Sequence, residues 1–359
     1  MGVTFEGGRT LGRDFSIDDL LADGYRAVYL GIGAHKDLAM GWGAVPNDGK
    51  LRVTGALAYL KAVNQKRQTE SGRHVVIIGG GNAAIDAART AKRLGAETVT
   101  VAYRRRREEM TAIREEIEAA EEEGVLIRAQ LLPVGLQTSG EPAIRFVKTS
   151  PGEPDESGRP RPVPLSETEF PLAADLVVSA IGQEILSDAL LLDGGKLELS
   201  ADALQVNPGN AQTSHPLVFA GGDLADSQRT VTDAIAWGKL AAWGIDCQLA
   251  GEEQAGTRPP VPSFKPDIPT FNMAGVRPVP QQKPETLGSS QRTADFAEVR
   301  KSLTQEQAMR EAERCLACGQ CGHCNSCIDL IGCPAFYVED DKVKIDRNLC
   351  AGCGLCAQV

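Results

Sequence analysis

The sequence predicts an α/β fold followed by a small cysteine-rich α+β module near the carboxyl end. Three observations support this prediction. A buried strand runs into a glycine turn and a helix over residues 75–94, a second buried strand ends on Gly-Gly-Asp at 221–223, and nine of the ten cysteines lie within residues 315–359. The chain has 359 residues, of which 42% are hydrophobic, so it can bury two or three cores of ordinary domain size.

The first 70 residues are predicted to form short strands and helices. Ser16-Ile17-Asp18-Asp19 has the spacing of a capping box and indicates the start of a short helix. The mostly apolar residues 26–30 indicate a buried strand, which ends at Gly31-Ile32-Gly33.

The clearest motif is a glycine turn between a strand and a helix. Residues 75–78 are an apolar strand, residues 79–84 read Gly-Gly-Gly-Asn-Ala-Ala, and a helix is expected through residue 94. This is the G-x-G-x-x-A pattern of a Rossmann-like dinucleotide-binding domain, in which the helix N-terminus favours anions. Gly79 permits the tight turn, and Gly81 lets the backbone approach a pyrophosphate. With Asn82 and Ala83 they are the candidate cofactor-binding residues here.

An arginine run, residues 104–107, follows the next predicted strand, residues 98–103. An acidic residue at this point would bind the ribose 2′-hydroxyl of NAD, whereas arginine presents a planar fork that matches a phosphate. We therefore expect NADP(H), with Arg104 and Arg105 as candidate residues for its 2′-phosphate. The alternative is a solvated basic run, but a position ahead of a helix N-terminus is unfavourable for cations.

The remaining segments before the cysteines differ in composition. A glutamate-rich helix predicted over residues 108–123 would turn Ile113, Ile117 and Ala120 inward. Residues 183–250 are expected to supply the strand 217–220 and an alanine-rich helix to about residue 249. Residues 251–298 hold eight of the twenty prolines and indicate an extended strap. A second capping box begins at Thr304 and opens a helix that leads to the cysteines.

The cysteines near the carboxyl end have the spacing of iron–sulfur ligands. A run at strict C-x2-C intervals comprises Cys315, Cys318, Cys321, Cys324 and Cys327. Cys333-Pro334 follows, and a second run comprises Cys350, Cys353 and Cys356. Disulfides are disfavoured because the sequence starts without an apolar secretion signal. Structural zinc is the stronger alternative, but long runs and the Cys-Pro ending favour a ferredoxin-like domain with 4Fe-4S clusters.

Taken together, these motifs resemble the flavoprotein disulfide reductase-like superfamily. The chain is more closely similar to the small (β) subunits of NADPH-dependent glutamate synthase and related NADPH:ferredoxin-type flavoproteins. The resemblance covers essentially the whole chain. It rests on Gly-Gly-Gly-Asn at 79–82, Tyr-Arg-Arg at 103–105 with Glu-Glu-Met at 108–110, Phe-Ala-Gly-Gly-Asp at 219–223, and Glu-Ala-Glu-Arg-Cys-Leu-Ala-Cys-Gly at 311–319.

The resemblance implies bound FAD. It implies that Asp223 hydrogen-bonds the ribityl chain, and that the helix starting at Thr230 and Val231 directs N–H groups at the N1–C2 carbonyl edge of the flavin. Gly182 and Gly222 are further expected cofactor-binding positions. The alternative role for Asp223 is a helix cap or turn residue.

Two departures from the family pattern lead us to expect an internal fragment of a longer flavoprotein. The family's first G-x-G-x-x-G turn, which holds the FAD pyrophosphate, has no counterpart in this sequence. At the other end, the sequence stops after Cys356 where the family has a further x3-Cys-Pro ligand. The alternative is a complete chain that takes these parts from a partner.

The expected cluster ligands follow from the rule that, in two-cluster ferredoxins, the cysteine before proline binds the other cluster. One cluster would then take Cys333, Cys350, Cys353 and Cys356. The other would take Cys321, Cys324 and Cys327 with a fourth ligand beyond Val359. The roles of Cys315 and Cys318 stay open, and Cys247 is expected to be an ordinary core cysteine.

The predicted function is an electron conduit. A hydride would pass between NADPH and FAD, and single electrons would continue through the clusters to a glutamate synthase large subunit or a ferredoxin-type acceptor. No acid, base or nucleophile is nominated, because such chemistry resides in the cofactors. A thioredoxin-reductase-like activity needs a redox C-x-x-C, yet residues 1–246 contain no cysteine. A non-catalytic electron-wiring subunit with an incomplete flavin site is the remaining alternative.

Charge and composition limit the partners. The net charge of −10 argues against nucleic acid, the sequence has no apolar stretch of membrane-spanning length, and the thiol-rich tail indicates a reducing cytoplasm. The expected domains are an incomplete first part of an FAD-binding domain (1–70), an NADP-binding domain (71–182), the returning part of the FAD-binding domain (183–250), a proline-rich strap and helix (251–314), and a truncated ferredoxin-like module (315–359).

Overall fold

The computed structural model describes residues 2–42, 50–68, 70–137, 139–155, 158–185, 197–200, 203–225, 229–251, 280–314, 335–339, 342–346 and 348–349. The chain divides into two compact units. The first comprises Met1–Pro259 with Ser289–Phe296, and the second comprises Pro260–Gly288 with Ala297–Val359. Among the helices in these ranges, none has the length and apolar character needed to cross a membrane.

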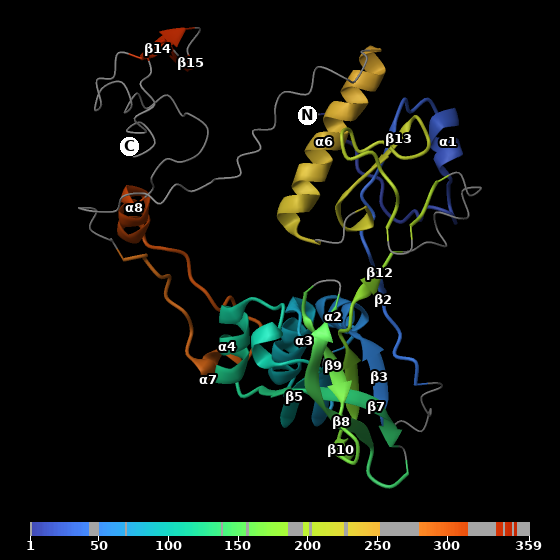
Figure 1. The fold of residues 1–359 in the computed structure, drawn as a ribbon, viewed down its shortest axis with the longest axis vertical. Helices are drawn as coiled ribbons and strands as arrows, with labels where there is room; N and C mark the ends of the chain where they lie inside the picture. The colour runs from blue at the N-terminus through green and yellow to red at the C-terminus, as the bar shows by residue number, and fades with distance from the viewer. Residues whose placement is uncertain are drawn as a thin grey trace. The chain divides into compact units, whose positions relative to one another are not determined.

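A five-stranded parallel sheet organises the lower lobe of the first unit (Figure 1). Its order is β3 (Arg52–Gly55), β11 (Leu176–Ser179), β4 (His74–Ile78), β5 (Thr98–Tyr103) and β6 (Leu126–Ala129). One face, with Val75 and Ile77, packs in a core with α3 (Asn82–Arg93) and α4 (Arg114–Glu122). The three inner strands, β11, β4 and β5, are almost fully buried because both of their faces are covered.

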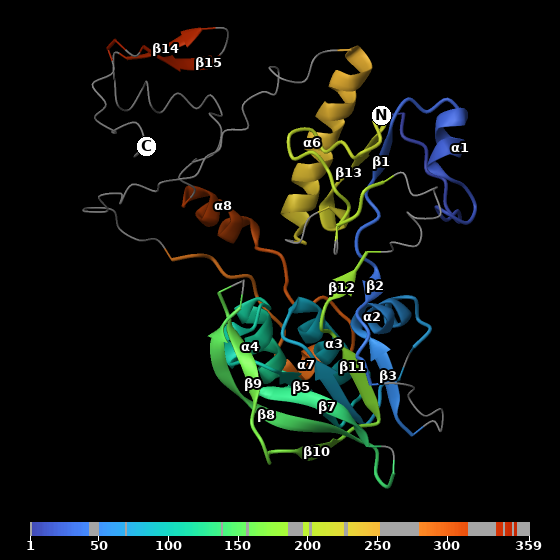
Figure 2. The ribbon, with the colours of Figure 1, turned by 45° about the vertical axis from the view of Figure 1, so that its right-hand side comes forward.

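The other face of the parallel sheet, with Val76 and Ile78, packs against an antiparallel sheet. That sheet is inserted between β6 and β11, and Figure 2 shows it beside the parallel strands. It consists of β7 (Leu131–Gln137), β8 (Ala143–Pro154), β9 (Pro160–Pro164) and β10 (Phe170–Ala173). The long strand β8 pairs with the other three, so the β8–β9 hairpin continues beyond β7 and β10.

A second lobe of this unit is built on β1 (Val28–Leu30), which pairs in parallel with β13 (Val218–Ala220). Its core also includes Ile17 of α1 (Ile17–Ala22) and Leu224 of the 3-10 turn η2 (Gly222–Leu224). The 20-residue helix α6 (Val231–Ala250) follows, and its Cys247 is buried and free, as expected. Two short strands, β2 (Lys36–Asp37) and β12 (Gln183–Glu184), pair where the chain passes between the lobes.

Several local predictions are confirmed. The strand 98–103 has the expected bounds, and both capping boxes form, at Ser16 and at Thr304. The continuous helix over 108–123 is wrong, because the chain forms the 3-10 turn η1 (Arg107–Glu109), a loop, and then α4. Ile113 lies in that loop and is 53% exposed rather than inward-facing.

The parallel sheet also begins earlier in the chain than the expected boundary at residue 71. Strand β3 pairs with β11, and helix α2 (Ala56–Asn64) packs beside α3. Strand β3 lies at the edge of the sheet, where one side of it has no neighbouring strand. Its sequence, Arg-Val-Thr-Gly, mixes polar and apolar residues, so the hydrophobic pattern does not predict a strand there.

The second unit contributes fewer described residues. Helix α8 (Gln305–Glu313) is held to the preceding segment by the Gln282 N–H, which donates to Glu311 Oε2 at 2.8 Å. Strands β14 (Phe336–Glu339) and β15 (Lys342–Ile345) form an antiparallel hairpin between the two cysteine runs. The nine cysteines of residues 315–359 lie outside the described residues. In the first unit, the short helix α7 (Ser289–Arg292) rests on α4, with Arg292 3.0 Å from Glu122.

Candidate nucleotide-binding site

The glycine turn after β4 is packed too tightly for side chains at its first two positions. Gly79 has φ +146°, and a Cβ there would lie 2.3 Å from the carbonyl oxygen of Ala180. A Cβ at Gly80 would lie 2.6 Å from the ring of Tyr103. Glycine is therefore required at both positions by the chain's own packing.

Gly81 differs from its two neighbours. A Cβ at Gly81 would meet only Thr111 Oγ1, at 3.5 Å, and its φ of −95° suits any residue. The protein itself thus leaves this face of the turn open. Helix α3 begins at Asn82 with no side chain capping it, so the N–H groups at its first turn, including those of Asn82 and Ala83, remain available to an anion.

A loop folds back over this turn and fixes it. The N–H groups of Thr111 and Ala112 both donate to the Gly80 carbonyl at 3.0 Å. Asn82 Oδ1 accepts the N–H of Ile113 at 2.9 Å, and the Tyr103 hydroxyl donates to the Glu109 carbonyl at 2.8 Å. Asn82 Oδ1 is therefore occupied by the loop, whereas the exposed amide nitrogen has no partner among the described residues and, like the backbone N–H, is open to a ligand. Sequence reasoning missed this loop because it took the segment for helix.

The four arginines after β5 have different environments. Arg105 is 7% exposed; its Nε donates to the Pro160 carbonyl at 2.9 Å and its Nη2 lies 2.5 Å from Asp155. Arg106 pairs with Glu109 at 3.2 Å, and this hydrogen bond lowers the pKa of the Glu109 carboxyl. Arg107 pairs with Glu121.

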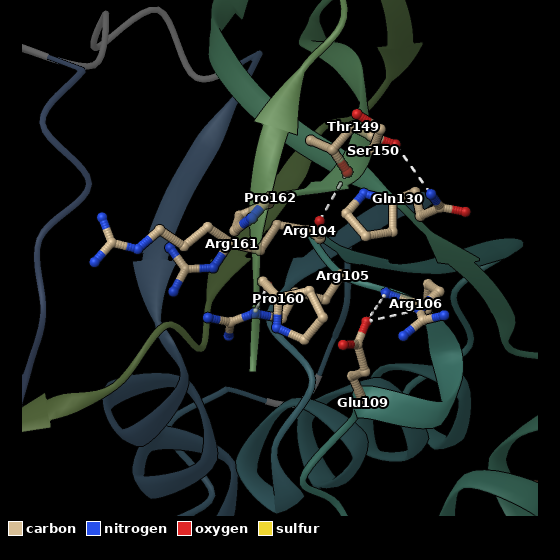
Figure 3. Close-up of a pocket in the computed structure, with 11 residues that line it drawn as sticks. Arg104, Arg105, Arg106, Glu109, Gln130, Thr149, Ser150, Pro160, Arg161 and Pro162 are labelled. Atoms are coloured by element: carbon tan, nitrogen blue, oxygen red, sulfur yellow. Dashed lines mark hydrogen bonds and ion pairs between the residues drawn. The ribbon is translucent and has the colours of Figure 1, made fainter. Parts of the chain in front are cut away.

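Arg104 is exposed, and among the described residues its guanidinium has no hydrogen bond or ion pair. It lines a recess together with Arg161 of β9 (Figure 3). Gln130, Thr149 and Glu109 also line it. Of the two arginines predicted to bind a phosphate, Arg104 is therefore available, whereas Arg105 is engaged within the protein.

The second predicted site lies at the end of β13. Gly221 allows helix α6 to approach, since a Cβ there would lie 2.5 Å from Trp237 Cβ. Gly222 has φ +65°, which turns the chain into η2. Asp223 lies within η2 and is half-buried, and among the described residues its carboxylate has no partner. It is available to accept a hydrogen bond from a ligand hydroxyl.

Helix α6 begins beside this turn. Thr230 is its N-cap, with Oγ1 accepting the Asp233 N–H at 3.1 Å, and Val231 is 78% exposed. The Thr230 side chain is thus used for capping, which leaves the backbone at the helix start as the predicted contact. Gly182 lies apart, before β12, with φ +136° and Leu38 Cδ1 2.9 Å from the position of a Cβ.

A buried ion network ties α3 to α4. The side chain of Glu123 is fully buried and lies 2.8 Å from Arg89 and 2.9 Å from Arg93. Burial alone would raise the pKa of Glu123, but hydrogen bonds from the two arginines outweigh it and lower the pKa. This network supports the helix of the glycine turn and lies outside the recess.

The chain matches known proteins along much of its length. A family model described as pyridine nucleotide-disulphide oxidoreductase matches residues 18–238. The NADP(+)-dependent formate dehydrogenase subunit beta of Moorella thermoacetica is 36% identical over 331 residues, covering 89% of this chain and 46% of that protein. The glutamate synthase [NADPH] small chain of Escherichia coli (strain K12) is 35% identical over 263 residues, covering 68% and 55%.

Other matches agree with these. The NADPH-Fe(3+) oxidoreductase subunit beta of Geobacter sulfurreducens is 32% identical over 354 residues, covering 89% of this chain and 52% of that protein. The chain spans about half the length of the curated relatives that it matches. The solved structure of Mycobacterium tuberculosis FprA in complex with NADPH has a TM-score of 0.51 at 16% identity, covering 66% of each chain. This last likeness shows the shared fold alone.

Proposed function

Because the chain belongs to the pyridine nucleotide-disulphide oxidoreductase family, we propose that it is an NADPH-dependent FAD and iron–sulfur oxidoreductase that passes electrons to a partner protein. The resemblance inferred from its motifs is confirmed by this family and by the glutamate synthase, formate dehydrogenase and NADPH-Fe(3+) oxidoreductase subunits. The names of all three relatives include NADP(+) or NADPH.

The observation that carries the proposal is the open glycine turn beside Arg104, which has no partner in the part of the chain that the structure describes. Gly81 leaves room for a pyrophosphate at the uncapped start of α3. Strands β4 and β5 are parallel neighbours with Ile78 opposite Ala102, so the turn and Arg104 lie at the same edge of the sheet. A dinucleotide whose pyrophosphate rests on α3 therefore reaches Arg104 with its adenosine ribose. Arginine there favours a 2′-phosphate and thus NADP(H) over NAD(H).

The turn after β13 fits FAD. Asp223 offers a half-buried carboxylate with no partner in the described chain, which suits a ribityl hydroxyl. The N-terminus of α6 places a positive dipole end nearby, where it stabilises negative charge. When bound, the nicotinamide supplies a hydride, the flavin exchanges electron pairs for single electrons, and iron–sulfur clusters carry those electrons onward.

The cluster ligands stay a proposal that rests on sequence spacing. We assign one 4Fe-4S cluster to Cys333, Cys350, Cys353 and Cys356. The second would use Cys321, Cys324 and Cys327 with a further ligand. The terminal acceptor is a redox partner such as a glutamate synthase large subunit or a ferredoxin-type protein.

Anaerobic reconstitution tests the proposal. Flavin, iron and sulfide are quantified, and the flavin spectrum is followed on adding NADPH or NADH. We expect bound flavin that bleaches with NADPH faster than with NADH, and equal amounts of iron and sulfide. Iron and sulfide without flavin would indicate an electron-wiring subunit instead. Zinc in place of iron would overturn the electron-transfer function.

A further inference from the structure

A second arginine with no partner among the described residues lines the recess at the end of β5. Arg161 lies on β9, in the sequence Pro160-Arg161-Pro162, and is exposed. Proline fixes its own φ and holds the preceding residue extended, so the two prolines restrict the backbone on both sides of Arg161. Figure 3 shows the Arg161 and Arg104 side chains in the same recess, although they come from different sheets.

The hairpin that carries Arg161 is attached firmly to the end of β5. The Thr149 hydroxyl of β8 donates to the Arg104 carbonyl at 2.8 Å, and the Gln130 N–H donates to the Arg105 carbonyl at 2.9 Å. The buried guanidinium of Arg105 then binds the Pro160 carbonyl, one residue before Arg161. The link between β5 and β9 therefore does not depend on a bound ligand.

The charges around the recess favour an anion. Glu109 is the acidic residue that lines it; its Oε2 accepts hydrogen bonds from both the side chain and the N–H of Arg106, while its Oε1 is buried without a partner among the described residues. Arg104 and Arg161 have no acidic partner among the described residues. Two unneutralised guanidinium groups on one recess repel each other until a multiply charged anion lies between them.

We propose that Arg161 is a second ligand of the NADP(H) 2′-phosphate, forming a two-arginine clamp with Arg104, and that Arg105 is a positioning residue that holds β9 in place. This inference rests on the proposed function. It assigns recognition of the 2′-phosphate partly to the inserted antiparallel sheet rather than to the dinucleotide-binding fold alone. In the run of four arginines, Arg104 is then a phosphate ligand and Arg105 a positioning residue, whereas Arg106 and Arg107 form ion pairs with glutamates.

The test measures adenosine phosphate binding to the full reconstituted chain by calorimetry. The probes are 2′,5′-ADP and 5′-AMP, which differ by the 2′-phosphate. We expect Arg161→Gln to weaken 2′,5′-ADP binding by about tenfold or more, with 5′-AMP binding unchanged, because a hydrogen bond to a charged group contributes roughly this much. Arg161→Lys should lose less affinity for 2′,5′-ADP than Arg161→Gln. The matched control is Arg128→Gln, an exposed arginine on β6 outside the recess, which should bind both probes as the wild type does.

The positioning role is tested by Asp155→Asn, which removes the charge that holds Arg105. We expect the ratio of 2′,5′-ADP to 5′-AMP affinity to fall, and Asp155→Glu to restore it. A purely structural role would lower stability and leave that ratio unchanged.

Other outcomes separate the two proposals. Unchanged 2′,5′-ADP binding by Arg161→Gln, together with weaker binding by Arg104→Gln, would overturn the clamp and leave NADPH use intact. Equal affinity of the wild type for both probes would overturn the NADP(H) preference itself, and the clamp with it.

Discussion

The two glycine turns of the first unit are built differently. Around Gly79 and Gly80, the chain's own atoms fill the space, and a loop and a buried ion network fix the turn and its helix. At the other turn, Asp223 has no partner in the described chain, Val231 is largely exposed, and no ion pair of the described residues involves α6. The first turn is thus shaped by the chain's own packing, whereas the second leaves polar groups that a ligand or a neighbour could contact.

The largest expected effect separates two positions of the first turn. Gly79→Ala should destabilise the parallel-sheet lobe by about 3 kcal/mol or more, because its Cβ would overlap the Ala180 carbonyl at a φ that L-residues avoid. Gly81→Ala should change the free energy of unfolding by less than about 0.5 kcal/mol yet weaken NADPH binding. Urea unfolding of both variants measures the change in stability, and NADPH titration measures the change in affinity. Equal losses of stability would show that Gly81 is also required by packing.

The buried network gives the next effect. Glu123→Gln should cost about 3 kcal/mol at neutral pH, because it leaves Arg89 and Arg93 buried beside a neutral amide. The folded-state pKa of Glu123 is lowered, so its contribution is complete above the pKa of the unfolded chain and is lost as pH falls through the folded pKa. Unfolding of both proteins measured from neutral to acidic pH should show curves that converge in acid. A difference in the free energy of unfolding that stayed constant at all pH values would contradict the claim that ionised Glu123 supplies this stability.

This contrast also explains what could be predicted from the sequence. The strand at 98–103, the turn at 79–84 and both capping boxes follow from local rules, because each depends on residues a few positions apart. The loop over Gly80 and the separate roles of Arg104 and Arg105 could not be predicted in this way. The loop is held to Gly80 and Asn82 by backbone groups that come about thirty residues later in the chain. The engaged state of Arg105 depends on Asp155 and Pro160, which lie about fifty residues away on the inserted hairpin and carry no motif.

A smaller effect concerns the second turn. Asp223→Ala should lower FAD affinity by about tenfold, the value of a hydrogen bond to a carboxylate, with little change in stability because its carboxylate has no partner among the described residues. Flavin content after dialysis and thermal unfolding of the flavin-free protein measure the two quantities. A large loss of stability in the flavin-free protein would instead make Asp223 a structural residue.

The smallest effect tests how the flavin-side helix starts. Thr230→Ala should cost about 1 kcal/mol, because it removes the side chain that accepts the Asp233 N–H. The loss should be local, since the first turn of α6 is exposed and its buried residues, such as Ala241 and Cys247, come later. Hydrogen exchange should therefore accelerate at the start of α6 and not near Cys247. Bound FAD should reduce the difference, because a ligand at the helix N-terminus replaces the lost cap. If FAD left the exchange unchanged, the ligand would not contact this end of the helix, and the second turn would need another partner.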